Sequence, residues 1–329
     1  MALHAYQYPM TQRLIIDTDT ASDDAVALVM AWQDERVEVL AVTVVSGNVP
    51  VEMGVQNALY TREICGAASP VYTGAYRPLM REHVFAHDVH GRDGMGDVGL
   101  ALTGRSADPG HAVDVLIDLA RRYPGEITLV TLGPLTNLAL ALRTAPDLAG
   151  LFGRVVMMAG TGDGTGNVTP TAEFNIYVDP EAADIVFSSG MPLEMVGWDA
   201  SRQDATLSVE AAAGLAEVGP LGRFCVDIQR QLFEFCRTVT QIDGVDLPDP
   251  LTLAVAIDPE VATRVVHKSV VVETLGRHTA GMTVVDHLGV TGREPNVKVV
   301  LRADHERFMT MLTRACTPET LRPRRKDNA

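Results

Sequence analysis

Residues 14–28 read LIIDTDTASDDAVAL: an apolar run, four aspartates and a second apolar stretch. The run at residues 14–16 predicts a short buried strand, and the apolar residues at 25–32 recur at the spacing of a helix. Ser22 stands where the N-cap of that helix is expected. A strand that passes directly into a helix is typical of α/β proteins, so this stretch predicts the start of a parallel sheet.

Strand and helix patterns alternate through the middle of the chain. Short apolar runs predict strands at residues 37–45, 127–131, 155–158 and 193–196. Helical spacing follows at residues 51–65, 135–143 and 181–188. The alternation predicts an α/β fold: a Rossmann-like open, mostly parallel central sheet with helices on both faces.

The last third of the chain departs from this alternation. Residues 270–273, 283–285 and 297–301 have strand patterns without long helices between them, so we expect a small late β annex. Neither a linker rich in Pro, Gly and Ser nor an internal repeat divides the sequence. We therefore expect a single domain over residues 1–329, with a core at about 13–315 and tails at 1–12 and 317–329.

The composition excludes several classes of protein. The chain has 329 residues, 47% of them hydrophobic, and a formal net charge of −15. Nucleic-acid binding needs a basic surface, so nucleic acid is not an expected partner. No stretch approaches the roughly 20 apolar residues of a membrane span. Residues 1–12 lack the apolar region of a secretory signal, and we therefore expect a cytoplasmic protein.

The four aspartates follow the first predicted strand and have no lysine or arginine beside them. In an open parallel sheet, ligands bind beyond the carboxyl ends of the strands, which is where these side chains fall. Carboxylates that converge at one place either have raised pKa values or hold a cation. Oxygen ligands without Cys or His favour Ca²⁺ or Mg²⁺. Helix capping explains Asp23 or Asp24 alone, but a metal site explains the whole group better.

The aspartate pattern resembles the amino-terminal signature of the nucleoside hydrolases, which are calcium-dependent N-ribohydrolases. Further matches follow in the order of that family, and the resemblance covers roughly residues 13–315. The matching motifs are Asp17-Thr18-Asp19-x-x-x-Asp23-Asp24, Val45-Ser46-Gly47-Asn48, Gly133-Pro134-Leu135-Thr136-Asn137, Gly166-Asn167, Ala172-Glu173-Phe174-Asn175, Asp179-Pro180-Glu181-Ala182-Ala183 and Asp249-Pro250.

The resemblance implies a calcium site and a catalytic base. Asp19, Asp24 and Asp249 would ligate Ca²⁺ together with the backbone carbonyl of Leu132, and Ca²⁺ accepts six to eight oxygens. Asp19 would also be the general base that activates a calcium-bound water for attack on the anomeric carbon. Asp17 would support the loop from behind the ligands. The implied reaction is hydrolysis of the N-glycosidic bond of ribonucleosides, through an oxocarbenium-like transition state.

The same resemblance assigns a group of residues to the ribose. Asp23 would hold the 2-hydroxyl, and Phe174 would form a wall beside the sugar. The remaining expected sugar contacts are Asn48, Asn167, Glu173 and Asn175. Taken alone, Asn167 is more simply interpreted as a turn residue. The Glu-Phe-Asn motif that follows it favours a role in binding the sugar instead.

One position departs from the family pattern. Many members that cleave inosine or uridine carry His directly before the last calcium-binding Asp, where it protonates the departing base, and here that position is Pro248. Purine-preferring members often lack this His and stack aromatic side chains on the base, so the substitution favours a purine preference. Candidate contacts to the leaving group are His87, His90, Trp198, Gln231 and Phe235. Gln231 and Phe235 are four apart on a predicted helix and would share a face.

Two other functions stay open at this point. Pro248 also fits a catalytically weak protein that binds ribose or nucleosides. The pair Asp17 and Asp19 fits a phosphatase of the haloacid dehalogenase type, which needs a later catalytic lysine that only Lys268 or Lys298 could supply. The resemblance further implies a homodimer or homotetramer.

Overall fold

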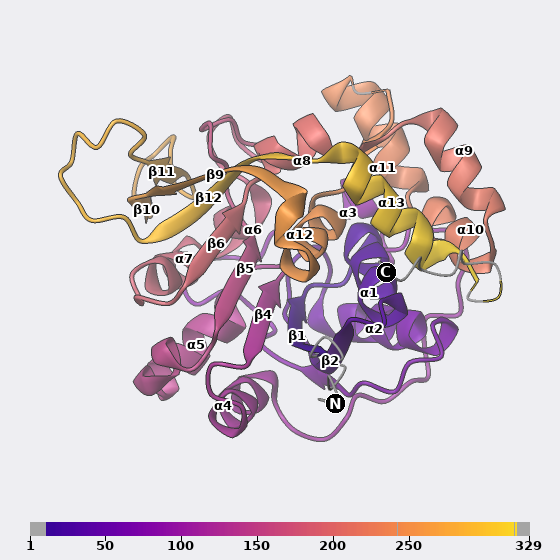
Figure 1. Ribbon diagram of the computed structural model, residues 1–329, viewed down its shortest axis with the longest axis horizontal. Helices are drawn as coiled ribbons and strands as arrows, with labels where there is room; N and C mark the ends of the chain where they lie inside the picture. Colours follow the sequence, from indigo (N-terminus) through magenta and orange to yellow (C-terminus); the bar gives the residue numbers. More distant parts are fainter. Residues whose placement is uncertain (1–10, 242, 319, 321–329) are drawn as a thin grey trace, which may run out of the picture.

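The computed structural model describes residues 11–241, 243–318 and 320 of the chain. Its centre is an eight-stranded sheet (Figure 1), in which every neighbouring pair is parallel except the last. In sheet order the strands are β3 (Val71–Thr73), β2 (Val37–Val44), β1 (Gln12–Thr18), β4 (Ile127–Thr131), β5 (Arg154–Met158), β6 (Leu193–Val196), β12 (Val297–Ala303) and β9 (Ala262–Lys268).

The strand order reverses at β1. From β1 the chain first adds β2 and β3 on one side, and then returns to place β4, β5 and β6 on the other. A crevice opens at such a reversal, because the helices that follow β1 and β4 leave on opposite faces of the sheet. Asp19 comes directly after β1 and Leu132 directly after β4, so both stand at this crevice.

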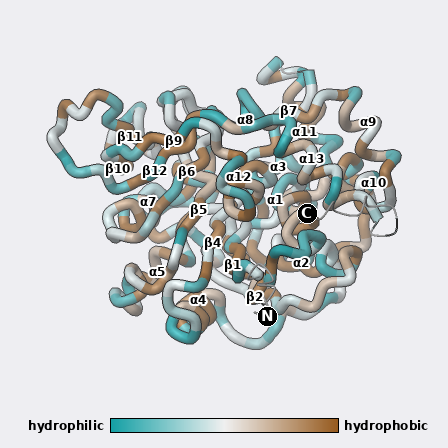
Figure 2. The backbone as a smooth tube through the Cα atoms, in the orientation of Figure 1, coloured by the Kyte–Doolittle hydropathy of each residue, from teal (hydrophilic) through white to brown (hydrophobic). Residues whose placement is uncertain are grey.

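Two apolar clusters, one on each face of the sheet, form the core. One joins alternate strand residues such as Leu14 and Ile16 to the helices on one face. The other joins Ile15 and Leu129 to the helices on the opposite face. Hydrophobic residues follow the central strands in Figure 2. Strands buried on both faces have near-continuous apolar sequences, which explains the apolar runs that predicted them.

The helices divide between these two faces. α1 (Ser22–Gln33), α2 (Val51–Ile64), α12 (Pro248–Ile257) and α13 (His305–Cys316) contribute to the first cluster. α4 (Ala112–Arg122), α5 (Thr136–Thr144) and α7 (Pro180–Phe187) contribute to the second. The remaining helices are α3 (His87–His90), α6 (Phe174–Val178), α8 (Trp198–Asp204), α9 (Val209–Glu217), α10 (Pro220–Asp227) and α11 (Arg230–Phe235), with a π-helical turn at Cys236–Thr240 and 3-10 turns at Pro146–Gly150 and Pro259–Val261.

The predicted α/β fold is confirmed, and the predicted strands and helices of its first two thirds occur within a few residues of their expected bounds. The late β annex is wrong in part. β10 (Val270–Val272) and β11 (Thr283–Val285) do pair as an antiparallel hairpin, but β12 lies in the central sheet. Its partners are β6 and the unpredicted β9. The pattern of β12 could not reveal a partner about a hundred residues away.

Two smaller expectations also change. Ser22 is the first residue of α1 and not its N-cap, since Ala21 holds that place. The end of the helix is stabilised from within: the Asp24 carboxylate accepts a hydrogen bond of 2.9 Å from the Ala21 N–H. The expected first tail ends earlier, because β1 already begins at Gln12. Residues 1–10 and most of the other expected tail lie outside the described residues.

Outside the main sheet, β7 (Thr206–Leu207) and β8 (Val245–Asp246) form a two-residue antiparallel pair directly before α12. This pair anchors the segment that leads into Asp249. Among the described residues, no helix combines the length and the apolar character that crossing a bilayer requires.

Candidate active site

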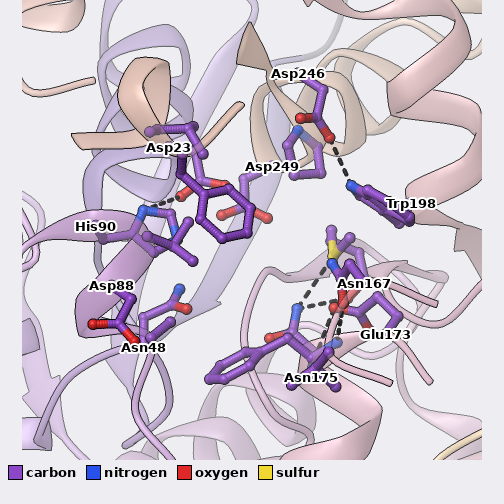
Figure 3. Close-up of a pocket in the computed structure, with 18 of the residues that line it drawn as sticks. Asp23, Asn48, Asp88, His90, Asn167, Glu173, Asn175, Trp198, Asp246 and Asp249 are labelled. Carbon is purple, nitrogen blue, oxygen red and sulfur yellow. Dashed lines mark hydrogen bonds and ion pairs between the residues drawn. The ribbon is translucent and has the colours of Figure 1, made fainter. Parts of the chain in front are cut away.

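A cavity of about 310 Å³ opens at the carboxyl ends of β1, β4 and β5. Figure 3 shows its side chains pointing inward from opposite sides, with Asp23, Asn48 and His90 on one and Asn167, Glu173, Asn175 and Trp198 on the other. The lining comes from segments far apart in the sequence. Among the described residues it consists of Asp23, Asn48, Val84, Phe85, Ala86, Asp88, Val89, His90, Leu132, Met158, Asn167, Val168, Glu173, Phe174, Asn175, Trp198, Leu232, Phe235, Cys236, Thr240, Asp246, Pro248 and Asp249.

Asp19 is completely buried at the end of β1 and does not itself line the cavity. Its Oδ2 accepts a hydrogen bond of 2.6 Å from the Asn48 N–H, while no described residue makes a hydrogen bond to its Oδ1. The backbone approaches it closely on two sides: a Cβ at Gly47 would lie 2.0 Å from Oδ2, and one at Gly133 would lie 2.7 Å from Oδ1. Burial and the charge of Asp24 raise the pKa of Asp19.

Asp23, Asp24 and Asp249 form a carboxylate cluster in which one oxygen of each lies within 4.8 Å of the others. Asp23 and Asp24 lie in the first turn of α1, and Asp249 lies in the first turn of α12, so two helix N-termini bring their positive ends to the cluster. Burial raises the pKa of Asp23 to about 7 and that of Asp24 to about 6. Burial, then the charges of Asp23, Asp24 and Asp19, raise the pKa of Asp249.

The residues present fit a hard cation. Within the described residues, the basic side chain that lies within 4 Å of these carboxylates is His90, whose Nδ1 is 3.6 Å from Asp23 Oδ1, and no lysine or arginine pairs with them. Oδ1 of Asp19 and Oδ1 of Asp23 are buried without a hydrogen-bond partner. A buried carboxylate oxygen is costly unless something positive compensates it. Carboxylate and carbonyl oxygens are the ligands of Ca²⁺ and Mg²⁺, so this donor set suits either ion.

Glu173 and its neighbours form a rigid polar wall. Oε2 of Glu173 accepts from the Gly160 N–H and Oε1 from the Asn175 N–H, each at 2.8 Å, so this carboxylate caps α6. Burial raises its pKa to about 7. Nδ2 of Asn175 donates to the Leu132 carbonyl at 2.8 Å. Oδ1 of Asn167 accepts from the Phe174 N–H at 3.0 Å, which fixes the amide that closes the wall.

The rest of the lining is largely apolar and contains two unpredicted carboxyl groups, the exposed Asp88 and the buried Asp246. Phe235 and Pro248 both line it, as do Leu232 and Trp198. The Trp198 indole Nε1 donates a hydrogen bond of 2.7 Å to Oδ2 of Asp246, drawn as a dashed line in Figure 3. Burial raises the pKa of Asp246. Its place three residues before Asp249 was the sequence signal that could have pointed to it.

A second unpredicted feature holds His90 in place. Nε2 of Gln229 donates to the Ser22 carbonyl at 2.7 Å, which turns Oε1 of Gln229 toward the Ser22 hydroxyl. That hydroxyl donates to Oε1 at 3.0 Å and lies 2.8 Å from Nδ1 of His90. Since Oε1 can only accept, the Ser22 proton points to it, and Nδ1 of His90 must donate. Burial lowers the pKa of His90 to about 4, so the ring is neutral with its proton on Nδ1.

The structure brings most of the predicted site residues together at the cavity or beside it. Asp19 and Asp24 are buried beside the cavity, and Asp17 lies behind it, where its Oδ2 accepts hydrogen bonds from Thr43 at 2.6 Å and Asn137 at 2.8 Å. Two candidates for contact with the leaving group do not line the cavity. His87 and Gln231 are not among the lining residues. The expectation that Gln231 shares the pocket face of Phe235 is wrong, because that face of α11 and the π-turn carries Leu232, Phe235 and Cys236.

Comparison with known proteins identifies the class to which this fold and site belong. A family model described as inosine-uridine preferring nucleoside hydrolase matches residues 14–310. The pyrimidine-specific ribonucleoside hydrolase RihA of Salmonella paratyphi C is 38% identical over 306 residues, which cover 92% of this chain and 97% of that protein.

Solved structures of nucleoside hydrolases have the same fold. The plant nucleoside hydrolase PpNRh1 superposes with a TM-score of 0.86 at 33% identity, covering 93% of this chain and 99% of its own. A purine-preferring ribonucleoside hydrolase from Gardnerella vaginalis gives a TM-score of 0.86 at 31% identity, covering 93% of this chain and 98% of its own.

The chain belongs to the nucleoside hydrolase family. It is therefore an enzyme of the N-glycosyl hydrolase class, in a metal-dependent family that acts on small-molecule nucleosides. The phosphatase alternative is wrong. Lys268 and Lys298, the lysines it would need, lie on β9 and β12 and are not among the residues that line the cavity.

Proposed function

We propose that this protein hydrolyses the N-glycosidic bond of ribonucleosides to ribose and free base, with calcium as its metal and Asp19 as the general base. The observation that carries the proposal is the cluster of Asp23, Asp24 and Asp249 at the cavity, in which one oxygen of each carboxylate lies within 4.8 Å of the others. Asp19 adjoins this cluster closely enough for its charge to affect the pKa of Asp249.

Asp19, Asp24, Asp249 and the Leu132 carbonyl would hold the Ca²⁺ ion. When bound, the ion supplies positive charge that lowers the pKa of a coordinated water molecule. Asp19 is suited to take the proton from that water: Oδ2 is fixed by the Asn48 N–H, and Oδ1 has no hydrogen-bond partner among the described residues. A base held in one orientation transfers the proton without first reorganising.

The polar residues of the cavity would orient the sugar. Asp23 and Asn48 line one side, and Asn167, Glu173, Phe174 and Asn175 line the other. A ribose between these two sides would meet carboxylates and amides at its hydroxyls. Glycosyl transfer develops positive charge on the sugar, and preorganised carboxylates stabilise that charge more in the transition state than in the ground state.

We also propose a preference for purine nucleosides. Pro248 lines the cavity and has no titratable group, and the aromatic rings of Phe85, Trp198 and Phe235 line it as well. A larger bicyclic base gains more from such rings than a pyrimidine does. Pyrimidine preference is the second candidate, since the 38% identical relative from Salmonella paratyphi C is named as pyrimidine-specific.

One assay tests the reaction and the base preference together. Calcium-loaded protein is incubated with inosine, guanosine, adenosine, uridine and cytidine and with a generic phosphate ester, and reducing sugar and phosphate are measured. Ribose release with purines ahead of pyrimidines is the expected result. Equal rates for inosine and uridine contradict the purine preference. Binding of nucleosides without ribose release would favour the catalytically weak binding protein.

The homodimer or homotetramer and the cytoplasmic location stay proposals. Light scattering coupled to size-exclusion chromatography measures the first directly, and a monomer at micromolar concentration contradicts it. Fractionation of cells that produce the native protein tests the second.

A further inference from the structure

We propose that Asp246 hydrogen-bonds the departing base and that Trp198 is its positioning residue, an inference that rests on the proposed function. Pro248 lines the cavity and has no polar side-chain group that could hold the base. The carboxyl group of Asp246, two residues earlier on β8, lines the same cavity.

The hydrogen bonds of Asp246 leave one oxygen available. Oδ2 accepts from the Trp198 indole at 2.7 Å. Among the described residues, the side-chain hydrogen bond that reaches Oδ1 comes from the Sγ of Cys236, at 3.9 Å. A thiol is a weak donor, so Oδ1 retains nearly all of its capacity to accept. Asp246 is only 6% exposed, which means that a ligand in the cavity, and not bulk solvent, is the partner available to it.

Asp246 is held rigidly in relation to the proposed metal ligands. It pairs with Thr206 in the short β7–β8 ladder, and the chain then enters α12 through Pro248 and reaches Asp249. Trp198 comes from the start of α8, directly after β6 of the central sheet. The base contact and the metal cluster are therefore joined through three residues of chain, and both are fixed to the sheet. Such support keeps a binding group within the small tolerance that catalysis needs.

Other polar groups around the cavity are less suited to this role. Both oxygens of Glu173 are taken by backbone N–H groups. His90 donates its Nδ1 proton toward Ser22 and is held beside Asp23, at the carboxylate cluster. Asp88 is exposed at the rim. Among the described residues that line the cavity, Asp246 is thus the buried carboxyl group that does not belong to the cluster of Asp23, Asp24 and Asp249 and whose Oδ1 can still accept a hydrogen bond from a ligand.

The acceptor character of Oδ1 defines the substrate class. It accepts from a base that presents a ring N–H or an amino group, as hypoxanthine and guanine do. Unsubstituted purine offers neither group on its six-membered ring, so its riboside would leave Oδ1 buried and unpaired. Sites built around a hydrogen bond discriminate strongly against analogues that lack it, because the buried partner stays unsatisfied.

The test compares substrates whose leaving groups can or cannot donate a hydrogen bond to Asp246. The wild-type enzyme and Asp246→Ala are assayed on inosine, purine riboside and 4-nitrophenyl β-D-ribofuranoside, whose phenolate leaves without a hydrogen bond from the enzyme. We expect Asp246→Ala to lower kcat/KM for inosine by about 50-fold or more and to change that for the nitrophenyl riboside by less than about threefold. The discrimination between inosine and purine riboside should collapse in the variant.

Trp198→Phe tests the positioning role. It keeps the ring and removes the N–H, so the same split between substrates is expected at about five- to tenfold. Asp114→Ala, an exposed change on α4 on the opposite face of the sheet, is the matched control and should leave all rates unchanged. If Asp246→Ala melts well below the wild type, Asp246→Asn, which keeps the volume and the partner for Trp198 but exchanges an acceptor for a donor, replaces it and should show the same split.

The outcomes separate this inference from the proposed function. If the wild type hydrolyses neither inosine nor the nitrophenyl riboside, the proposed function is contradicted. If the wild type hydrolyses both, and Asp246→Ala loses activity equally on the two or not at all, only the role assigned to Asp246 is overturned. That role is also overturned if the wild type hydrolyses the nitrophenyl riboside but neither inosine nor guanosine.

Discussion

The Asn48 N–H donates a hydrogen bond of 2.6 Å to Oδ2 of Asp19, and this bond joins the loop after β2 to the end of β1. It determines which oxygen of Asp19 is bound by the protein and which is left for the reaction, since Oδ1 has no hydrogen-bond partner within the described part of the chain. The loop can lie this close only because residue 47 is glycine.

Asp19→Asn should reduce kcat by about 10³-fold or more, because an amide cannot take a proton from water and is a weaker calcium ligand. The side-chain volume is nearly unchanged, so the far-ultraviolet circular dichroism spectrum should match the wild type. Steady-state kinetics on the best nucleoside measures the loss. Activity near that of the wild type would overturn the assignment of Asp19 as the base.

Gly47→Ala should abolish most of the activity although it adds one methyl group far from solvent. Its Cβ would lie 2.0 Å from Oδ2 of Asp19, so the carboxylate or the loop must move. Gly214→Ala is the matched control: a Cβ there meets nothing within 4 Å, and position 214 lies inside α9. The control should keep full activity and gain up to about 1 kcal/mol in stability, as alanine does in helix interiors. Equal behaviour of the two variants contradicts the close approach at Gly47.

Calcium affinity should increase as the pH rises from about 5 to about 8. Without metal, burial raises the pKa of Asp24 to about 6 and that of Asp23 to about 7, so below these values the folded protein holds protons that the cation must displace. Each displaced proton contributes up to about a tenfold change in affinity per pH unit. Isothermal titration calorimetry in buffers of different ionisation enthalpy measures both the affinity and the protons released. An affinity that does not depend on pH would mean that these carboxylates are not the site.

Removal of the metal should inactivate the enzyme and lower its melting temperature together. Dialysis against a chelator leaves Asp19, Asp23, Asp24 and Asp249 buried beside one another without a compensating charge, which destabilises the native state. Added Ca²⁺ should restore both activity and melting temperature, and Mg²⁺ should restore less of each if calcium is the physiological ion. Full activity after exhaustive chelation contradicts a metal requirement.

Asn137→Ala should destabilise the protein by about 2–4 kcal/mol, the cost of leaving buried polar groups without partners. The Nδ2 of Asn137 donates to Oδ2 of Asp17 at 2.8 Å, and its Oδ1 accepts from the Ala75 N–H at 2.8 Å. Replacing Asn137 with alanine therefore removes both hydrogen bonds at once. Urea denaturation measures the change. Asp147→Ala is the control: it breaks an exposed ion pair between Asp147 and Arg121 of α4 and should leave the urea midpoint unchanged.

The main sheet and the acidic cluster could be predicted from the sequence because both depend on local patterns. Apolar runs followed by helical spacing identified β1, β2, β4, β5 and β6, and parallel strand ends had to bring Asp19 and the loop at Asn48 together. Contacts that depend on irregular geometry could not be predicted. Leu232 lines the cavity beside Phe235 and Gln231 does not, although both precede Phe235 by about one helical turn. The pairing of Trp198 with Asp246 joins two segments about fifty residues apart, with no periodicity to relate them.

The position of β12 in the central sheet determines what happens to truncated forms of this protein. Residues 297–303 fill the place between β6 and β9, so a chain that stops before Val297 leaves the backbone N–H and C=O groups of β6 unpaired along one side. That side belongs to the strand Leu193–Val196, whose residues are apolar except for Glu194 and are all buried in the complete fold. An unprotected apolar edge recruits strands from other molecules. A nonsense mutation late in the gene should therefore yield a chain that aggregates, and not a shortened enzyme with partial activity.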